Sequence, residues 1–208
     1  MKTGLPFITH LLLGTLLLAA SLSGCATIDQ KIDLSYSPID RAFGRQSESI
    51  VVARANSAPA VRNSRGEWIV GALNNVHGVH KADLLADRNQ GEWVTDALLL
   101  ELKHAGFNAT YKDPLPVGAT LGIQLSDITS FMNVNRDLFN TEVKQELKFT
   151  VDIFQNGSRV KTFAVASRTS QTVALIASAD ENAKIMLQAL QDAMQQVMSE
   201  VHAQTQKK

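Results

Sequence analysis

Apolar residues along this chain form short runs and two long stripes, which predict strands and helices respectively. The short runs are either rich in β-branched residues or alternate with polar residues at period two, as in buried or half-buried strands. We predict strands over residues 49–54, 68–73, 107–111, 120–128, 143–154 and 159–170.

The two stripes repeat at helical spacing and predict amphipathic helices over residues 92–104 and 179–203. Gly106 follows the first stripe, at the position where a left-handed C-terminal cap is needed. The apolar face of the first helix is expected to consist of Trp93, Ala97, Leu98, Leu100 and Leu102.

The connections complete the predicted order of elements. Asn156-Gly157 lies between two alternating runs and predicts a hairpin turn, because a type I′ turn needs positive φ at both central residues. Residues 74–90 lack periodicity and predict a mobile loop. The order is therefore β-β-α-β-β-β-β-α, an α+β fold in which one antiparallel-rich sheet carries two helices on one face.

The N-terminus has the pattern of a bacterial lipoprotein signal. An apolar segment over residues 5–22 ends in the lipobox Leu22, Ser23, Gly24 and Cys25, with small residues before the cysteine as a signal peptidase requires. An uncleaved transmembrane anchor is the alternative, since the segment nearly reaches the length that spans a bilayer.

Cleavage before Cys25 would leave an N-terminus modified by lipid. The lipobox resemblance implies diacylglycerol on the Cys25 sulfur and usually a third chain on its amine, and two or three chains form a lasting anchor. Ala26 follows the cysteine. An Asp there resembles an inner-membrane retention signal, so its absence favours the outer membrane and its periplasmic face.

The chain then divides into three parts: a signal peptide over 1–24, a lipidated N-terminus and flexible tether over 25–48, and one domain over 49–208. The tether is polar, and fully extended it would reach about 80 Å. Alternation of Ile32, Leu34 and Tyr36 leaves open a second possibility, an edge strand paired with the domain. As a tether, residues 25–48 would be dispensable for folding.

Charge and cysteine content narrow the functional classes. The chain has 20 basic and 20 acidic residues, so it lacks the basic excess of a nucleic-acid-binding protein. Its only cysteine is Cys25, so no intramolecular disulfide is expected and stability must come from packing.

One cluster has the residue types of a metal site. His77 and His80 are followed by Asp83 and Asp87, which could together ligate a transition metal. Gly78 interrupts helical spacing, however, and we interpret the segment as a solvated polar loop. No metal or cofactor is expected.

Two common catalytic motifs are absent from the sequence. It contains no nucleophile elbow and no phosphate-binding glycine loop. Glu92 and Asp96 form a carboxylate pair on the first helix, which the helix dipole explains without catalysis. Trp68 and Trp93 could stack on a sugar or peptide, but core packing is the more common role of tryptophan.

The whole chain resembles the YajG-like family of bacterial outer-membrane lipoproteins. Besides the lipobox, the resemblance rests on residues 32–38 (IDLSYSP), residues 98–107 (LLLELKHAGF) and residues 121–125 (LGIQL). It implies a lipidated, periplasm-facing domain with no established reaction and no functional residue to transfer except Cys25.

We therefore expect a non-enzymatic outer-membrane lipoprotein that acts as a binding or accessory module of the cell envelope. Its expected partners are the membrane, through the N-terminal lipid, and an envelope protein. Two alternatives remain: an accessory subunit of a cell-wall synthase or lipid transporter, and an enzyme acting on an envelope glycan. Converging carboxylates with perturbed pKa values would favour the enzyme, and an apolar patch or open sheet edge would favour the binding module.

Overall fold

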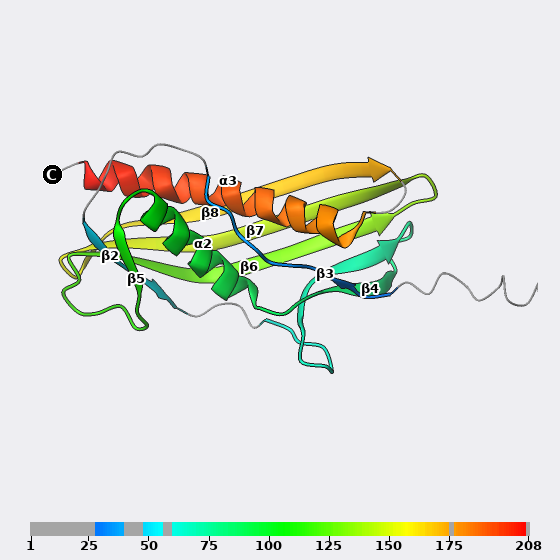
Figure 1. The fold of residues 1–208 in the computed structure, drawn as a ribbon, viewed down its shortest axis with the longest axis horizontal. Helices are drawn as coiled ribbons and strands as arrows, with labels where there is room; N and C mark the ends of the chain where they lie inside the picture. Colours follow the sequence, from blue (N-terminus) through cyan, green and yellow to red (C-terminus); the bar gives the residue numbers. More distant parts are fainter. Residues whose placement is uncertain (1–27, 40–47, 56–59, 175–176, 207–208) are drawn as a thin grey trace, which may run out of the picture.

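A computed structural model describes residues 28–39, 48–55, 60–174 and 177–206 (Figure 1). The predicted signal peptide, the lipobox and Cys25 lie outside the described residues. Within them, eight strands form one sheet with two helices. The strands are β1 (Gln30–Lys31), β2 (Ser49–Arg54), β3 (Trp68–Asn75), β4 (His80–Ala86), β5 (Asn108–Tyr111), β6 (Leu121–Arg136), β7 (Asn140–Gln155) and β8 (Ser158–Ala174).

The last three strands form a long antiparallel ribbon. β6 pairs with β7 from Leu121 to Arg136, and β7 pairs with β8 along its whole length. Asn156 and Gly157 join β7 to β8 with φ values of 48° and 77°, so the predicted Asn-Gly hairpin is confirmed. A turn of two residues can join neighbouring strands only when they run in opposite directions, so β7 and β8 are antiparallel.

The other edge of β6 carries the rest of the sheet. β2 and β3 both pair with β6 in parallel, β5 extends the sheet beyond β2, and β4 and β1 extend it beyond β3. β3 and β4 are antiparallel, whereas β1 joins β4 in parallel. The sheet is therefore mixed, with its longest pairings antiparallel.

Helices α2 (Gln90–His104) and α3 (Ala179–Thr205) lie on the same face of the sheet, as Figure 1 shows, and contact each other. The predicted α+β class is thus confirmed. Gly106 adopts φ 90° after α2, and the amide of Phe107 donates to the Leu102 carbonyl at 2.9 Å, as expected of the predicted left-handed cap.

Two expectations about this half of the chain are wrong. Residues 74–90 are not a mobile loop, because most of them form the end of β3, the whole of β4 and the start of α2. Strand β4 is buried at its C-terminal end (Leu84, Leu85 and Ala86) between β3 and β1. A strand buried on both faces lacks the alternation by which strands are recognised in sequence.

The apolar face of α2 also differs from the expected one. Leu100 is exposed, whereas Glu101 is completely buried. Glu101 lies three residues after Leu98 and four after Ala97, so it shares their face of the helix. Helical spacing therefore brings the Glu101 side chain into the core, although glutamate is a residue type that is rarely buried.

The largest correction concerns the tether. Residues 28–39, here called the N-terminal strap, run between α2 and α3 (Figure 1). Ile32 and Leu34 are each only 1% exposed and belong to the main core, and the Ile32 amide donates to the Leu85 carbonyl at 2.7 Å. An edge strand does form, but at Gln30 and Lys31, just before the Ile32, Leu34 and Tyr36 for which the alternative was stated. The folded unit therefore begins well before residue 49, because Ile32 and Leu34 of the strap are buried in the core that the helices and the sheet share.

We predict that Leu34→Ala lowers the free energy of unfolding by about 2–5 kcal/mol, because it leaves a cavity in a packed core. Asp33→Ala, at the neighbouring exposed position, should change it by no more than about 0.5 kcal/mol. Urea unfolding of the two variants measures this. Equal midpoints would mean that the strap adds nothing to the core.

Candidate functional site

The sheet has a break along one edge of β6. On this edge β2 pairs with β6 as far as Leu125, and β3 begins to pair at Met132. Between these points, residues 126–131 have no strand partner on this edge within the described part of the chain. The break exists because the chain leaves the sheet after β2 and returns thirteen residues later as β3.

A groove of about 870 Å³ lies at this break. It is open to solvent and mixes apolar and polar side chains from seven short segments of the chain. Its apolar lining includes Val61, Trp68, Ile69, Ile128 and Phe131, and its polar lining includes Arg54, Gln90, Asp113, Ser130, Glu146 and Lys148.

The first turn of α2 forms one wall of the groove. Gln90 is nearly buried, and its side-chain amide donates to the carbonyls of Ile69 at 3.2 Å and Ser130 at 3.3 Å. Behind it, the Gln145 amide donates to the Ser130 hydroxyl at 2.8 Å. These bonds join α2, β3, β6 and β7, so this wall of the groove is rigid.

Charges of both signs line the groove. Glu146 is hydrogen-bonded to Lys148 at 3.1 Å, and Arg168 lies 3.5 Å from its other oxygen. The hydrogen bond from Lys148, together with the charges of Lys148 and Arg168, lowers the pKa of Glu146 below its usual value. This carboxylate therefore stays ionised at neutral pH.

A second cluster surrounds Glu101 and holds the N-terminal strap. Tyr36 donates its hydroxyl proton to Glu101 Oε1, and the amide of Ile39 donates to the same oxygen at 2.8 Å. Burial and the hydrogen bond to Glu101 raise the pKa of Tyr36 far above its usual value, so the phenol remains protonated. The Trp93 indole also donates to the Ser35 carbonyl at 3.1 Å. The strap is thus attached to α2 by polar as well as apolar contacts.

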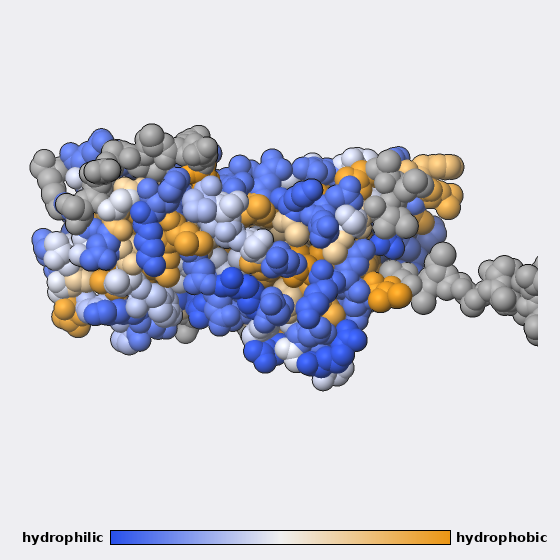
Figure 2. Space-filling model, in the orientation of Figure 1, coloured by the Kyte–Doolittle hydropathy of each residue, from blue (hydrophilic) through white to orange (hydrophobic). Residues whose placement is uncertain are grey.

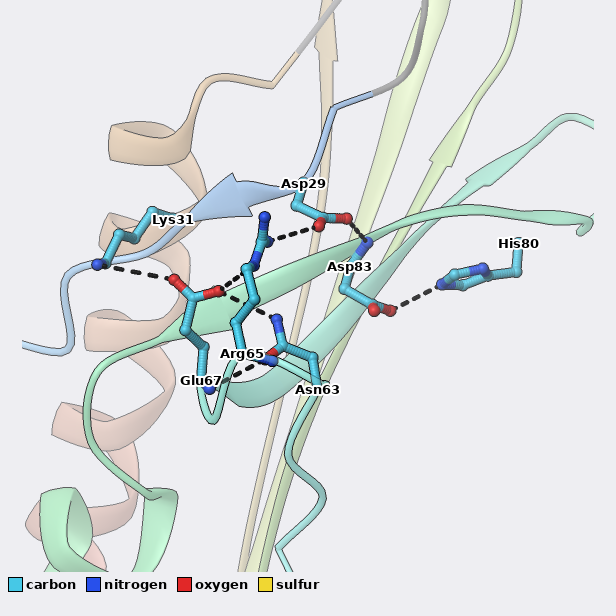
Figure 3. A network of polar contacts seen from close by, with 7 residues as sticks. All are labelled: Asp29, Lys31, Asn63, Arg65, Glu67, His80 and Asp83. Atoms are coloured by element: carbon cyan, nitrogen blue, oxygen red, sulfur yellow. Dashed lines mark hydrogen bonds and ion pairs between the residues drawn. The ribbon is translucent and has the colours of Figure 1, made fainter.

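Figure 3 shows a further network where the strap begins. Asp29 accepts from the amide of Asp83 at 3.0 Å and binds the Arg65 guanidinium at 3.0 Å. Arg65 also binds Glu67 at 2.9 Å, and Lys31 lies 3.8 Å from the same carboxylate. Hydrogen bonding from Asn63 and the charges of Arg65 and Lys31 lower the Glu67 pKa. The network joins the strap to the loop before β3.

Of the four residues considered as metal ligands, His80 and Asp83 are the pair that the structure brings within hydrogen-bond distance. His80 lies on β4 and its Nε2 is 2.8 Å from Asp83 Oδ1 (Figure 3). His77 lies in the turn before β4, exposed to solvent. Over the described residues, no three side chains of metal-ligand type come together.

Other residues highlighted in the sequence are distributed as follows. Trp93 is fully buried, as expected of a core tryptophan, but Trp68 is half-buried in the groove with the Arg62 guanidinium 3.8 Å above its ring. Glu92 and Asp96 are exposed on α2, where Asp96 pairs with Arg88. The groove was missed because it is formed by a break in pairing, which no local pattern in the sequence signals.

Neither helix in the described residues offers an apolar stretch long enough to cross a bilayer.

No family model and no curated protein matches the sequence, so the YajG-like resemblance stays a prediction. Several solved structures are similar. A Xanthomonas campestris protein of family DUF330 is 13% identical over 83% of this chain and 92% of that one, with a TM-score of 0.47. A Helicobacter pylori neuraminyllactose-binding hemagglutinin homolog is 12% identical over 80% and 92%, with a TM-score of 0.43. An Acinetobacter baumannii minor lipoprotein is 15% identical over 65% and 91%, also with a TM-score of 0.43.

We predict that Tyr36→Phe lowers the free energy of unfolding by about 1–3 kcal/mol, because it removes a donor from a buried carboxylate. Tyr111→Phe is the matched control: Tyr111 is 42% exposed, and its hydroxyl lies 3.3 Å from Asp113 at the surface. That control should stay within about 0.5 kcal/mol of the parent chain. Thermal or urea unfolding of both variants tests this, and equal losses would contradict the assigned role of Glu101.

Proposed function

We propose that this chain is an outer-membrane lipoprotein whose domain binds an extended segment of another envelope protein in the groove. The observation that carries the proposal is the break on β6, where residues 126–131 lack a strand partner on one edge in the described part of the chain. Unpaired strand edges bind extended peptides by adding a strand, with backbone hydrogen bonds supplying affinity.

The dimensions of the break suit a short segment. Six residues of strand extend over at most about 20 Å. The bulge at Asp127 and the bond from Gln90 to the Ser130 carbonyl occupy part of this length, so the break suits a ligand segment shorter than six residues. Trp68 and Phe131 offer apolar contact on the lining, while Arg54, Asp113 and Lys148 offer charges of both signs. Such a surface suits a polypeptide with mixed side chains.

The competing proposal is an enzyme that acts on a glycan. The carboxylate Glu146 in the groove supports an enzyme less well than it supports peptide binding. A glycosidase of the common type needs one carboxyl with a raised pKa to act as general acid. Glu146 has the opposite property, since Lys148 and Arg168 hold its pKa below the usual value. A role as accessory subunit of a cell-wall synthase or lipid transporter is compatible with peptide binding.

The anchor is proposed from the lipobox ending at Cys25, and outer-membrane sorting from Ala26. Two or three acyl chains at the N-terminus would hold the domain at the membrane surface.

We predict that Cys25→Ser abolishes lipid attachment and processing, because the serine hydroxyl is a far weaker nucleophile than the thiol near neutral pH. Labelled palmitate should enter the parent chain but not the variant, which should accumulate as the longer precursor. Equal labelling of the two would refute the lipobox assignment.

The groove is tested with a photo-crosslinking residue at Phe131 in intact cells. We expect it to capture a defined segment of an envelope protein, whereas the same residue at Val160, equally exposed but outside the groove, should not. A synthetic peptide of the captured segment should then bind the purified protein.

The peptide should slow hydrogen exchange of those amides of residues 126–131 that point away from β7, because a new strand would occupy this open edge. Amides of the exposed loop around Val117 serve as the internal control. Peptide binding without protection of residues 126–131, or capture of glycan in place of protein, would contradict the proposal.

A further inference from the structure

Exposed apolar side chains gather at one end of the molecule. In the described residues, large hydrophobic side chains that are more than half exposed include one at the start of the strap, two in the β3–β4 turn and two in the β6–β7 turn. They are Ile28, Val76, Val79, Leu138 and Phe139. Figure 2 shows apolar patches at this end, on the right of the view.

Strand registers place these segments together. β3 runs parallel to β6 with Asn75 opposite Arg136, so the turns that follow the two strands emerge at the same level. Val76 accordingly lines a small hollow with Asp137 and Asn140 of the neighbouring turn. The two hairpin tips therefore project side by side.

The first described residue of the strap, Ile28, lies at this same end. Gln30 lies opposite Leu84 in a parallel pair, so the residues before Gln30 run beside the first half of β4, toward the turn at Val79. Only three residue steps separate Ile28 from Cys25, a span of at most about 10 Å. Because the strap is docked, no long tether separates a lipid on Cys25 from the domain.

We infer that this end of the domain lies against the bilayer, with the β3–β4 and β6–β7 tips immersed in its headgroup region; the inference rests on the proposed lipid anchor. Leu138 and Phe139 are 81% and 76% exposed, and burying them among lipid removes apolar surface from water. Lys81, exposed beside the β3–β4 turn, would meet lipid phosphates. Asp137 limits the depth, because its carboxylate belongs in the hydrated layer.

This orientation places the groove away from the membrane surface. The groove lies on the middle of β6, between the β2 and β3 pairings, whereas the tips follow the end of β6. A partner could therefore reach the groove while the domain rests on lipid.

The lipidated full chain tests this, with a single cysteine introduced as Phe139→Cys and labelled with a polarity-sensitive nitrobenzoxadiazole probe. Val117→Cys is the matched control: Val117 is fully exposed and apolar, but lies near the Asn156-Gly157 turn at the opposite end of β7, about 50 Å away. Both proteins are incorporated into vesicles of phosphatidylethanolamine and phosphatidylglycerol.

We expect the probe at 139 to shift its emission to the blue and to react with aqueous dithionite about tenfold more slowly than the probe at 117, because lipid shields it. Equal reaction rates at both positions would overturn the inference. The inference would also be overturned if the probe at 139 were protected from dithionite only in vesicles that contain envelope proteins. In that case the two tips would contact a protein partner and not lipid.

Failure of the anchor is distinguishable from failure of this orientation. In the parent chain, Cys25 should resist labelling, because a thioether-linked sulfur does not react. A labelled Cys25, with a chain that does not float with vesicles, would refute the lipid anchor itself. An unreactive Cys25 with a water-exposed probe at 139 would refute only the orientation.

Discussion

Strand β6 is the element on which the rest of the sheet depends. One edge pairs with β7 from Leu121 to Arg136, while the other edge is shared by two shorter parallel strands, β2 and β3. Because a single chain must leave the sheet between β2 and β3, the shared edge cannot be covered continuously. The resulting break is the origin of the groove, and Gln90 of α2 spans part of it by bonding to Ile69 and Ser130.

The N-terminal strap joins the anchor to this framework. Ile32 and Leu34 complete the core between the helices, and Glu101 accepts from Tyr36 and Ile39 further along the strap. A buried carboxylate is costly without such donors, so the strap and α2 stabilise each other. A docked strap also changes what a lipid on Cys25 would do, since it would hold one end of the domain close to the bilayer and restrict its orientation.

Much of the fold was predictable from the sequence because local patterns carry it. The Asn156-Gly157 hairpin, the Gly106 cap and the helical stripes each follow from backbone conformation or periodicity over a few residues. Strand β4 was not predictable in the same way, because it is buried on both faces toward its C-terminal end. The candidate site was not predictable either: its residues come from distant segments, and none forms a motif.

The sequence by itself determined the α+β class, the two helices, the long hairpin ribbon and the expectation of a lipid-bearing N-terminus at Cys25. Only the tertiary structure decided that the strap belongs to the core, that Glu101 is buried and that residues 126–131 lack a strand partner on one edge. The physical reason is the range of the interactions involved. Turns, caps and amphipathic stripes depend on neighbours a few residues apart. In contrast, the burial of the strap against the helices and the pairing of a strand edge depend on segments that only folding brings together.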